Sequence, residues 1–282
     1  MDKNCIITGA TDGIGKQTAI DLANLGYNLG LVGRNKEKGR FITQEIAKIT
    51  GNKSIKYFNA DLSVIKNTKY VADNIKNEFK SIDVLVNNVG AYFSNYKKTE
   101  EGLEKTFALN HLSYFALTHL LLDVLESEGS GRVINVSSSA HFSAKLDITD
   151  FQMEKKYKGW TAYCNSKLMN ILFTYEADKK FKDKNVSFNC LHPGFVNTSF
   201  GDDNKGFGKN ILSIGKKLIA INVKKGASTN VYLASSNKLS KVSGKYFYKS
   251  NRTKSSKTSY LDSHQKRLWS YSKKIINDLL ED

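Results

Sequence analysis

The chain has few of the features of a secreted, metal-binding or membrane-spanning protein. Its three cysteines, Cys5, Cys164 and Cys190, lack the spacing of a metal site, so we expect no metal and free thiols in a reducing compartment. No apolar run reaches the roughly 20 residues that span a bilayer, and the first residues lack the basic and apolar regions of a signal peptide. The sequence therefore predicts a cytoplasmic protein.

Acidic residues are almost missing from the C-terminal quarter. Residues 205–274 hold seventeen lysines and arginines and one acid, Asp262, so this stretch accounts for the whole formal net charge of +16. Nucleic-acid binding would require a recognisable module, and because none is present we expect no nucleic-acid partner. Two interpretations stay open: peripheral contact with an anionic membrane, and a coding bias toward lysine and asparagine with a single proline.

Short apolar runs alternate with amphipathic helical stretches through the first two thirds of the chain. The expected strands are the runs at 4–8, 27–33, 54–60, 82–88, 131–138 and 185–192. Continuous apolar strands separated by helices predict a buried parallel sheet. We therefore expect an α/β fold, a single Rossmann-type doubly wound parallel sheet with helices on both faces, forming one domain over residues 1–282.

Three long connections follow expected strands, at 88–100, 139–159 and 193–224. Long loops at the carboxyl ends of such sheets usually bind ligands. We interpret 195–224 as a substrate lid, because it is rich in phenylalanine, isoleucine and leucine. Its part at 209–225 mixes apolar residues with paired lysines, which is typical either of an interfacial helix or of a mobile lid with incidental charge. A basic C-terminal segment follows at about 238–282.

The stretch "TGATDGIG", residues 8–15, predicts a phosphate-binding turn between a strand and a helix. Gly9 would close the turn, Gly13 would let a phosphate approach the backbone, and Gly15 would allow close packing at the helix start. The spacing is GxxxGxG. Its place between a strand and a helix favours a dinucleotide site over a structural loop.

The end of the second expected strand bears on the choice of cofactor. An NAD site usually places a carboxylate there, whereas this chain has Gly33, Arg34 and Asn35. Because a guanidinium pairs well with a phosphate, Arg34 favours NADP(H) over NAD. The alternative is a surface arginine at a strand end, and Asp12 in the glycine turn weighs slightly against NADP(H).

Tyr163 and Lys167, in "WTAYCNSKLMN", lie four positions apart in an expected helix. Residues with this spacing share one face of a helix, so both could reach one site. The spacing alone cannot decide between a proton-transfer pair and two polar surface residues, because Tyr175 and Lys179 repeat it later in the same helix.

Several motifs together carry a family resemblance. They are "TGATDGIG", "NNVG" at 87–90, Asn110, "INVSSS" at 134–139, "YCNSK" at 163–167 and "HPGFVNT" at 192–198. In order and spacing they resemble the classical short-chain dehydrogenases/reductases. Whole phrases, among them "LNHLSYFALTHLLL" and "AYCNSKLMN", resemble the branch of retinol dehydrogenases and WW-domain oxidoreductases most closely.

The resemblance implies a catalytic tetrad. Tyr163 would be the general acid, Lys167 would lower the tyrosine pKa and bind the nicotinamide ribose, and Ser138 would hydrogen-bond the substrate oxygen. Asn110 would interrupt its helix and hold a water that links Lys167 to solvent. Ser137 and Ser139 are the obvious misassignments, and the pattern favours the second serine.

The remaining site residues follow from the same resemblance. The implied cofactor contacts are Gly9, Thr11, Asp12, Gly13, Ile14, Gly15, Arg34, Asn35, Asp61, Leu62, Asn87, Asn88, Gly90, Tyr163, Lys167, Pro193, Gly194, Val196 and Thr198. The implied substrate pocket is formed by Ser138, His141, Tyr163 and Phe195. Apolar residues around it suggest a lipophilic substrate.

We therefore expect an NADP(H)-dependent oxidoreductase that acts on a lipophilic carbonyl or alcohol of the retinal, steroid or lipid-aldehyde type. The rival is a non-catalytic NADP-binding regulator on the same fold. The long apolar helices at 103–122 and 163–181 resemble the family's dimer faces, which is compatible with a homodimer or homotetramer.

Overall fold

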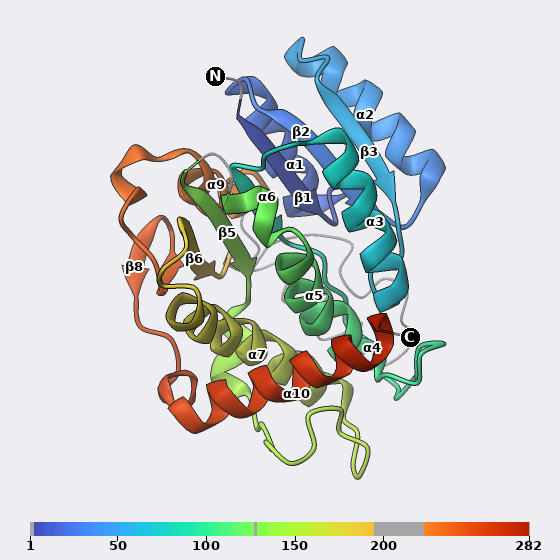
Figure 1. Cartoon of the computed structure of the whole chain (residues 1–282), viewed down its shortest axis with the longest axis vertical. Coiled ribbons are helices and arrows are strands. Elements are labelled where there is room, and N and C mark those ends of the chain that lie inside the picture. Colours follow the sequence, from blue (N-terminus) through green and yellow to red (C-terminus); the bar gives the residue numbers. More distant parts are fainter. Residues whose placement is uncertain (1–2, 127–128, 195–222, 282) are drawn as a thin grey trace.

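An eight-stranded sheet forms the centre of the molecule, in the order β3-β2-β1-β4-β5-β6-β7-β8. The computed structural model describes residues 3–126, 129–194 and 223–281. The strands are β1 (Asn4–Thr8), β2 (Asn28–Gly33), β3 (Ile55–Asn59), β4 (Val84–Asn87), β5 (Gly131–Val136), β6 (Val186–Leu191), β7 (Lys245–Tyr248) and β8 (Asn251–Thr253). All neighbours pair in parallel except β7 and β8. The predicted Rossmann-type architecture is confirmed (Figure 1).

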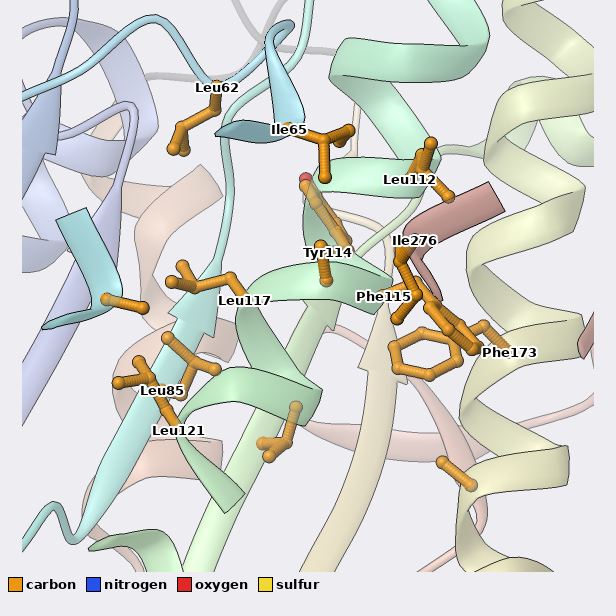
Figure 2. Packing of buried hydrophobic residues seen from close by; sticks show 14 of the residues in the cluster. Leu62, Ile65, Leu85, Leu112, Tyr114, Phe115, Leu117, Leu121, Phe173 and Ile276 are labelled. Carbon is orange, nitrogen blue, oxygen red and sulfur yellow. The ribbon is translucent and has the colours of Figure 1, made fainter. Parts of the chain in front are cut away.

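Helices cover both faces of this sheet. The α-helices are α1 (Gly13–Asn24), α2 (Lys36–Thr50), α3 (Ile65–Glu78), α4 (Lys105–Phe107), α5 (Ser113–Leu120), α6 (Leu122–Glu126), α7 (Gly159–Lys180), α9 (Val223–Ser235) and α10 (Asp262–Leu280). The 3₁₀ turns are η2 (Ser139–Ser143), η3 (Asn237–Leu239) and η4 (Lys257–Tyr260). One core lies against α1, α2 and α9, and a second against α3, α5, α7 and α10 (Figure 2).

The strand order reverses between β1 and β4, which both pair in parallel within the sheet. In a doubly wound sheet the connections on either side of this point run to opposite faces, so a crevice opens at the carboxyl ends of the two strands. The glycine turn follows β1 and the "NNVG" motif overlaps the end of β4. The fold thus brings two of the predicted motifs to one edge.

The helix that contains Asn110 is interrupted, as predicted. Residues Ala108–Leu112 form a π-helical turn, η1, between α4 and α5. The amide of Asn110 donates to Ala91 O at 2.9 Å and accepts from Ala91 N at 2.9 Å. Insertions of this kind are frequent at functional sites because they redirect a side chain. Here the turn directs Asn110 toward the loop after β4.

The helix α10 covers the face formed by α5 and α7 (Figure 1). The Trp269 ring on α10 lies 5.1 Å from Phe115 of α5 and 6.0 Å from Phe173 of α7. The Nε2 atom of His111 in η1 lies 3.0 Å from Ser272 Oγ of α10. In an oligomer that used the helices at 103–122 and 163–181, the partner subunit would therefore contact α10 before it could reach these helices.

We predict that Trp269→Ala lowers the free energy of unfolding by about 3 kcal/mol, because it removes an aromatic side chain packed against two helices. Urea unfolding followed by circular dichroism measures the change. The matched control is Trp160→Ala, at the chain's other tryptophan, whose side chain is 48% exposed and whose loss should change stability by about 1 kcal/mol or less. Equal losses would contradict the packing role of α10.

Among the described residues, no helix is long and apolar enough to cross a membrane. Most of the predicted lid, including Phe195, Val196 and Thr198, lies outside the described residues. The basic segment at 238–282 contains β7, β8 and α10, so it is an integral part of the sheet and of the second core.

Candidate active site

The glycine turn joins β1 to α1 in a conformation that only glycine fits. Gly9 has a φ of +65°, in the left-handed region that side chains disfavour. A Cβ on Gly15 would lie 2.2 Å from Gly9 O and 2.6 Å from Asn88 Nδ2. Glycine thus leaves the main chain at the start of α1 uncovered, and the N–H groups that follow Gly13 suit the phosphates of a dinucleotide.

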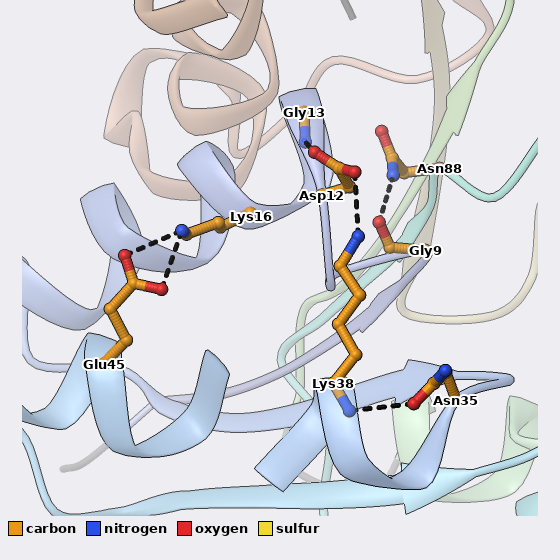
Figure 3. A network of polar contacts seen from close by, with 8 residues as sticks. All are labelled: Gly9, Asp12, Gly13, Lys16, Asn35, Lys38, Glu45 and Asn88. Carbon is orange, nitrogen blue, oxygen red and sulfur yellow. Dashed lines mark hydrogen bonds and ion pairs between the residues drawn. The ribbon is translucent and has the colours of Figure 1, made fainter. Parts of the chain in front are cut away.

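Asp12 caps α1 and is paired with a lysine that the sequence analysis missed. Its Oδ1 accepts from Gly13 N at 2.7 Å, and its Oδ2 lies 2.8 Å from Lys38 Nζ (Figure 3). Lys38 lies in the first turn of α2, whose N-cap Asn35 accepts from Lys38 N at 2.8 Å. The acid that weighed against NADP(H) is thus offset by a neighbouring ammonium group.

Arg34 lies directly after β2 and is exposed at the same edge of the sheet. A guanidinium at this place suits a phosphate on the adenosine ribose, since charge-assisted hydrogen bonds to phosphate are strong. The choice of NADP(H) over NAD stays a prediction.

The two asparagines of "NNVG" have different roles. Asn88 Nδ2 donates to Thr8 O at 2.9 Å and Asn88 N donates to Thr8 Oγ1 at 2.9 Å, so this residue supports the glycine turn. Asn87 is fully buried, and its side chain donates to Thr118 Oγ1 at 3.1 Å and to Asn135 Oδ1 at 2.9 Å. Because side chains alternate along a strand, Asn87 faces the core. Its side chain supports the strands around the site, and its place beside the adenosine ribose stays a prediction.

Ser138, Tyr163 and Lys167 come together at the carboxyl end of β5. Ser138 follows β5, and Tyr163 and Lys167 lie on α7. Ser138 acts on the Tyr163 hydroxyl as a side-chain hydrogen-bonding neighbour that lowers its pKa, so the two side chains lie close together. The Nζ of Lys167 lies 5.6 Å from the centre of the Tyr163 ring, so the three predicted groups form one cluster.

The hydrogen bonds also separate the three neighbouring serines. Ser137 is buried and donates to Lys167 O at 2.7 Å, which gives it a structural role. Ser139 is exposed at the start of η2. Of the three serines, only Ser138 lowers the pKa of Tyr163, and its Oγ accepts from Ala140 N at 3.2 Å. The geometry therefore favours the second serine.

Burial dominates the electrostatics of this cluster. Desolvation raises the pKa of Tyr163, and the hydrogen bond with Ser138 opposes that rise. Desolvation also lowers the pKa of Lys167 to about 8, and its Nζ donates to Val136 O at 3.3 Å. The tyrosine thus keeps its proton at neutral pH, beside a lysine that holds its charge weakly.

The Asn110 amide lies on the other side of Lys167. A Cβ on Gly90 would lie 3.1 Å from Lys167 Nζ and 3.5 Å from Asn110 Oδ1. Both side chains therefore pack against Gly90. Asn110 Nδ2 also donates to Ser166 Oγ at 3.1 Å. The predicted tetrad is brought together in space, whereas the water predicted to link Asn110 to Lys167 stays a prediction.

The remaining predicted contacts lie around this cluster. Asp61 and Leu62 follow β3, and Asp61 Oδ1 accepts from Ser63 N at 2.9 Å while Leu62 is buried in the core. Pro193 and Gly194 follow β6, and Gly194 N donates to His192 Nδ1 at 3.2 Å. Thr11 and Ile14 lie within the glycine turn and the start of α1.

Comparison with known proteins adds an independent finding to this geometry. The sequence model of the family described as "short chain dehydrogenase" matches residues 3–206. The chain belongs to the short-chain dehydrogenase family.

Relatives place this short-chain dehydrogenase in the retinol dehydrogenase branch. It is 35% identical to retinol dehydrogenase 13 of Homo sapiens over 279 residues, covering 97% of this chain and 84% of the relative. It is 34% identical to human polyprenol dehydrogenase over 277 residues, covering 96% and 84%. A crystal structure of an uncharacterized protein from Mycobacterium paratuberculosis matches with a TM-score of 0.78 and 26% identity, covering 98% and 93%. These findings support an oxidoreductase that acts on CH–OH or carbonyl groups with a nicotinamide cofactor.

This short-chain dehydrogenase also uses residues that sequence reasoning did not single out. Tyr114 is fully buried, and its hydroxyl donates to Val89 O at 2.7 Å, directly before Gly90. Asn170 Nδ2 donates to Val136 O at 3.4 Å, the carbonyl that Lys167 also reaches. Tyr114 has a weak signal in the sequence, a polar group within the apolar helix α5, whereas Asn170 lies among other polar residues of α7 and has none.

Proposed function

We propose that this short-chain dehydrogenase is an NADP(H)-dependent reductase of lipophilic aldehydes or ketones that also works in reverse as an alcohol dehydrogenase. The observation that carries the proposal is the pairing of Tyr163 with Ser138, which lowers the tyrosine pKa, and with Lys167, whose Nζ lies 5.6 Å from the tyrosine ring centre. The pair lies at the same edge of the sheet as the glycine turn.

NADPH held by the glycine turn and Arg34 would supply the hydride for the carbonyl carbon. Tyr163 donates its proton to the carbonyl oxygen, so the product is a neutral alcohol. Ser138 donates a hydrogen bond to the same oxygen and fixes its position. The Lys167 ammonium stabilises the tyrosinate that remains, because an opposite charge nearby favours the ionised form.

The surroundings of Tyr163 support a lipophilic substrate. The Trp160 ring stacks on Tyr163 with 5.7 Å between centroids and is 48% exposed. Phe142, in the loop after Ser138, is 58% exposed. Exposed aromatic rings beside a polar centre are typical of pockets for apolar ligands, and the relatives are named for retinol and polyprenol.

The test is NADPH oxidation followed by absorbance with retinal, medium-chain lipid aldehydes, a steroid ketone and a short polar aldehyde. We expect turnover of the lipophilic carbonyls and little with the polar one. The rival function is a non-catalytic NADP-binding regulator. Protein that binds NADPH in a titration but reduces no carbonyl would favour that rival.

For the cofactor we predict that Arg34→Asp lowers kcat/KM for NADPH by about 10-fold to 100-fold, because a charge-assisted hydrogen bond to phosphate contributes about 1.5 to 3 kcal/mol. The value for NADH should rise, since the new carboxylate can accept from a ribose hydroxyl. Arg40→Asp is the control for the charge change. Arg40 is exposed on α2 and pairs with Glu37 at 3.6 Å. A preference for NADPH that survives Arg34→Asp would refute the assignment.

The remaining partners stay predictions. The segment 209–225, expected to touch an anionic membrane, falls largely outside the described residues. A cytoplasmic location with peripheral membrane contact, and a homodimer or homotetramer, are compatible with the proposed function but are not needed for it.

A further inference from the structure

The imidazole of His141 bridges the Ser138 loop and the C-terminal segment. Its Nδ1 lies 2.7 Å from Ser138 O, and its Nε2 lies 3.1 Å from the main-chain nitrogen of Ser256. A main-chain N–H can only donate, so Nε2 is the acceptor and the ring proton is on Nδ1. The two hydrogen bonds together fix one neutral tautomer.

This ring has no surface to offer a substrate. His141 is 1% exposed, and the Tyr246 ring of β7 packs 5.1 Å from it. The sequence analysis placed His141 at the edge of the substrate pocket, whereas both ring nitrogens are engaged by main-chain atoms. Burial lowers the pKa of His141, which keeps the ring in the neutral form that accepting from Ser256 requires.

Ser256 is itself held in place by the segment that leads into α10. Ser259 Oγ donates to Ser256 O at 2.6 Å, and Gln265 Nε2 of α10 donates to Ser259 O at 2.7 Å. The main-chain N–H that reaches His141 therefore belongs to a hydrogen-bonded turn. That turn is anchored to the helix which covers α5 and α7.

The other end of the bridge is the serine proposed to hold the substrate oxygen. Ser138 O accepts from the His141 ring and also from His141 N at 3.1 Å. Ser138 Oγ accepts from Ala140 N at 3.2 Å. The imidazole is thus the only one of these contacts that connects the loop to a distant part of the described chain.

We propose that His141 is a positioning residue which, by joining Ser138 O to Ser256 N, lets the C-terminal segment hold the Ser138 hydroxyl against Tyr163. The inference rests on the proposed function, because it assigns the bridge to the reaction of Ser138 and Tyr163. It gives the main-chain N–H of Ser256, beyond the stretch matched by the family, a part in that reaction.

Ser256 offers a test that removes a single hydrogen bond. Its φ is −62°, which proline adopts without strain, so Ser256→Pro removes the N–H that His141 accepts. Ser256→Ala is the matched control, because it keeps the N–H and loses the same hydroxyl, which has no hydrogen-bond partner among the described residues. Both variants should bind NADPH as the wild type does.

We expect Ser256→Pro to lower kcat for carbonyl reduction by about 10-fold to 100-fold, since small misplacements of a catalytic group have effects of this size. The KM for NADPH should not change, and Ser256→Ala should keep the wild-type kcat. Equal kcat values in the two variants would overturn the proposal. A merely structural role would lower the melting temperature of Ser256→Pro without lowering kcat per folded molecule.

Two further measurements keep the test decisive. If Ser256→Pro does not fold by circular dichroism, His141→Asn takes its place, because its shorter amide can reach Ser138 O but not Ser256. The same fall in kcat supports the proposal, and an unchanged kcat overturns it.

If the wild type reduces no carbonyl, the proposed function fails. Nitrogen NMR of the histidine rings then tests whether His141 forms the hydrogen bond with Ser256. A protonated Nδ1 at His141 whose ring signals shift in Ser256→Pro, but not in Ser256→Ala, supports it, and a protonated Nε2 overturns it.

Discussion

Tyr163→Phe is expected to lower kcat for carbonyl reduction by about 10²-fold to 10⁴-fold, the usual contribution of a positioned general acid. Phenylalanine keeps the ring that stacks on Trp160 at 5.7 Å and removes only the hydroxyl whose pKa Ser138 lowers. NADPH affinity should therefore be retained. Steady-state NADPH oxidation measures the loss, and a fluorescence titration measures cofactor binding.

Tyr175→Phe provides a control at a tyrosine with the same spacing from a lysine on the same helix. The Tyr175 hydroxyl lies 2.7 Å from Ser255 Oγ, and Lys179 pairs with Asp262 of α10. Losing this hydrogen bond should lower the free energy of unfolding by about 1 kcal/mol and leave kcat within about threefold of the wild type, well short of the loss of a general acid. A Tyr163→Phe enzyme as active as Tyr175→Phe would remove Tyr163 from its role.

The two tyrosines show what sequence can and cannot decide about a site. Their spacing from a lysine is identical, and both are buried. Tyr163 differs because α7 brings it to the end of β5, where Ser138 follows the strand, while Tyr175 meets the segment after β8. That difference depends on which strand end each turn of the helix passes. Helical periodicity does not contain this information, and only the agreement of separate motifs could predict it.

The fold was predictable where strands are buried on both faces. Strands β1, β2, β4, β5 and β6 are short, largely buried runs that contain Val, Ile or Leu, and such runs are recognisable because a parallel sheet excludes most polar side chains on either side. The edge strand β8 is exposed throughout, so it has no apolar pattern. The buried stripe of α10 contains Gln265 and Ser272 beside Leu268 and Ile276. Polar residues in the stripe weaken its helical periodicity.

The site was predictable where the backbone imposes the residue type. Gly9 and Gly15 are required by a left-handed φ and a close carbonyl, so their pattern survives as a motif. Lys38 and Ser256 act through contacts with Asp12 and His141 that join distant segments. Nothing in their local sequence marks them. The different roles of Asn87 and Asn88 were not predictable either, because neighbouring residues on a strand face opposite sides and the motif does not state which side chain bonds into the core.

Replacing Lys167 by methionine is expected to abolish turnover and, in the protein without cofactor, to raise stability. Lys167 is 4% exposed, and burial lowers its pKa from 10.5 to about 8. At pH 7 the folded protein therefore holds a buried ammonium group, which a methionine of similar length would replace with apolar contacts. In the variant, Val136 O loses the hydrogen bond from Lys167. It keeps the one from Asn170 Nδ2 at 3.4 Å, so this carbonyl is not left without a donor.

The pH dependence gives this prediction a sign. Because the folded pKa is below the unfolded one, the unfolded chain binds more protons between about pH 8 and pH 10.5. The destabilisation caused by burying the Lys167 ammonium is therefore at its full value below about pH 8, and it is absent above about pH 10.5. Lys167→Met should exceed the wild type by up to about 3 kcal/mol at pH 7, and the difference should close as pH rises through this window.

Urea unfolding at several pH values measures the difference, and NADPH oxidation measures turnover. Lys179→Met is the matched control, since Lys179 is the lysine four positions after Tyr175 and its side chain is 48% exposed. That variant should lose less than about 1 kcal/mol and keep its activity. A Lys167→Met protein less stable than the wild type at pH 7 would mean that the ammonium group contributes net stability. Lys167 would then stabilise the fold itself, and its buried charge would not be a cost that the protein bears in order to stabilise the tyrosinate of Tyr163.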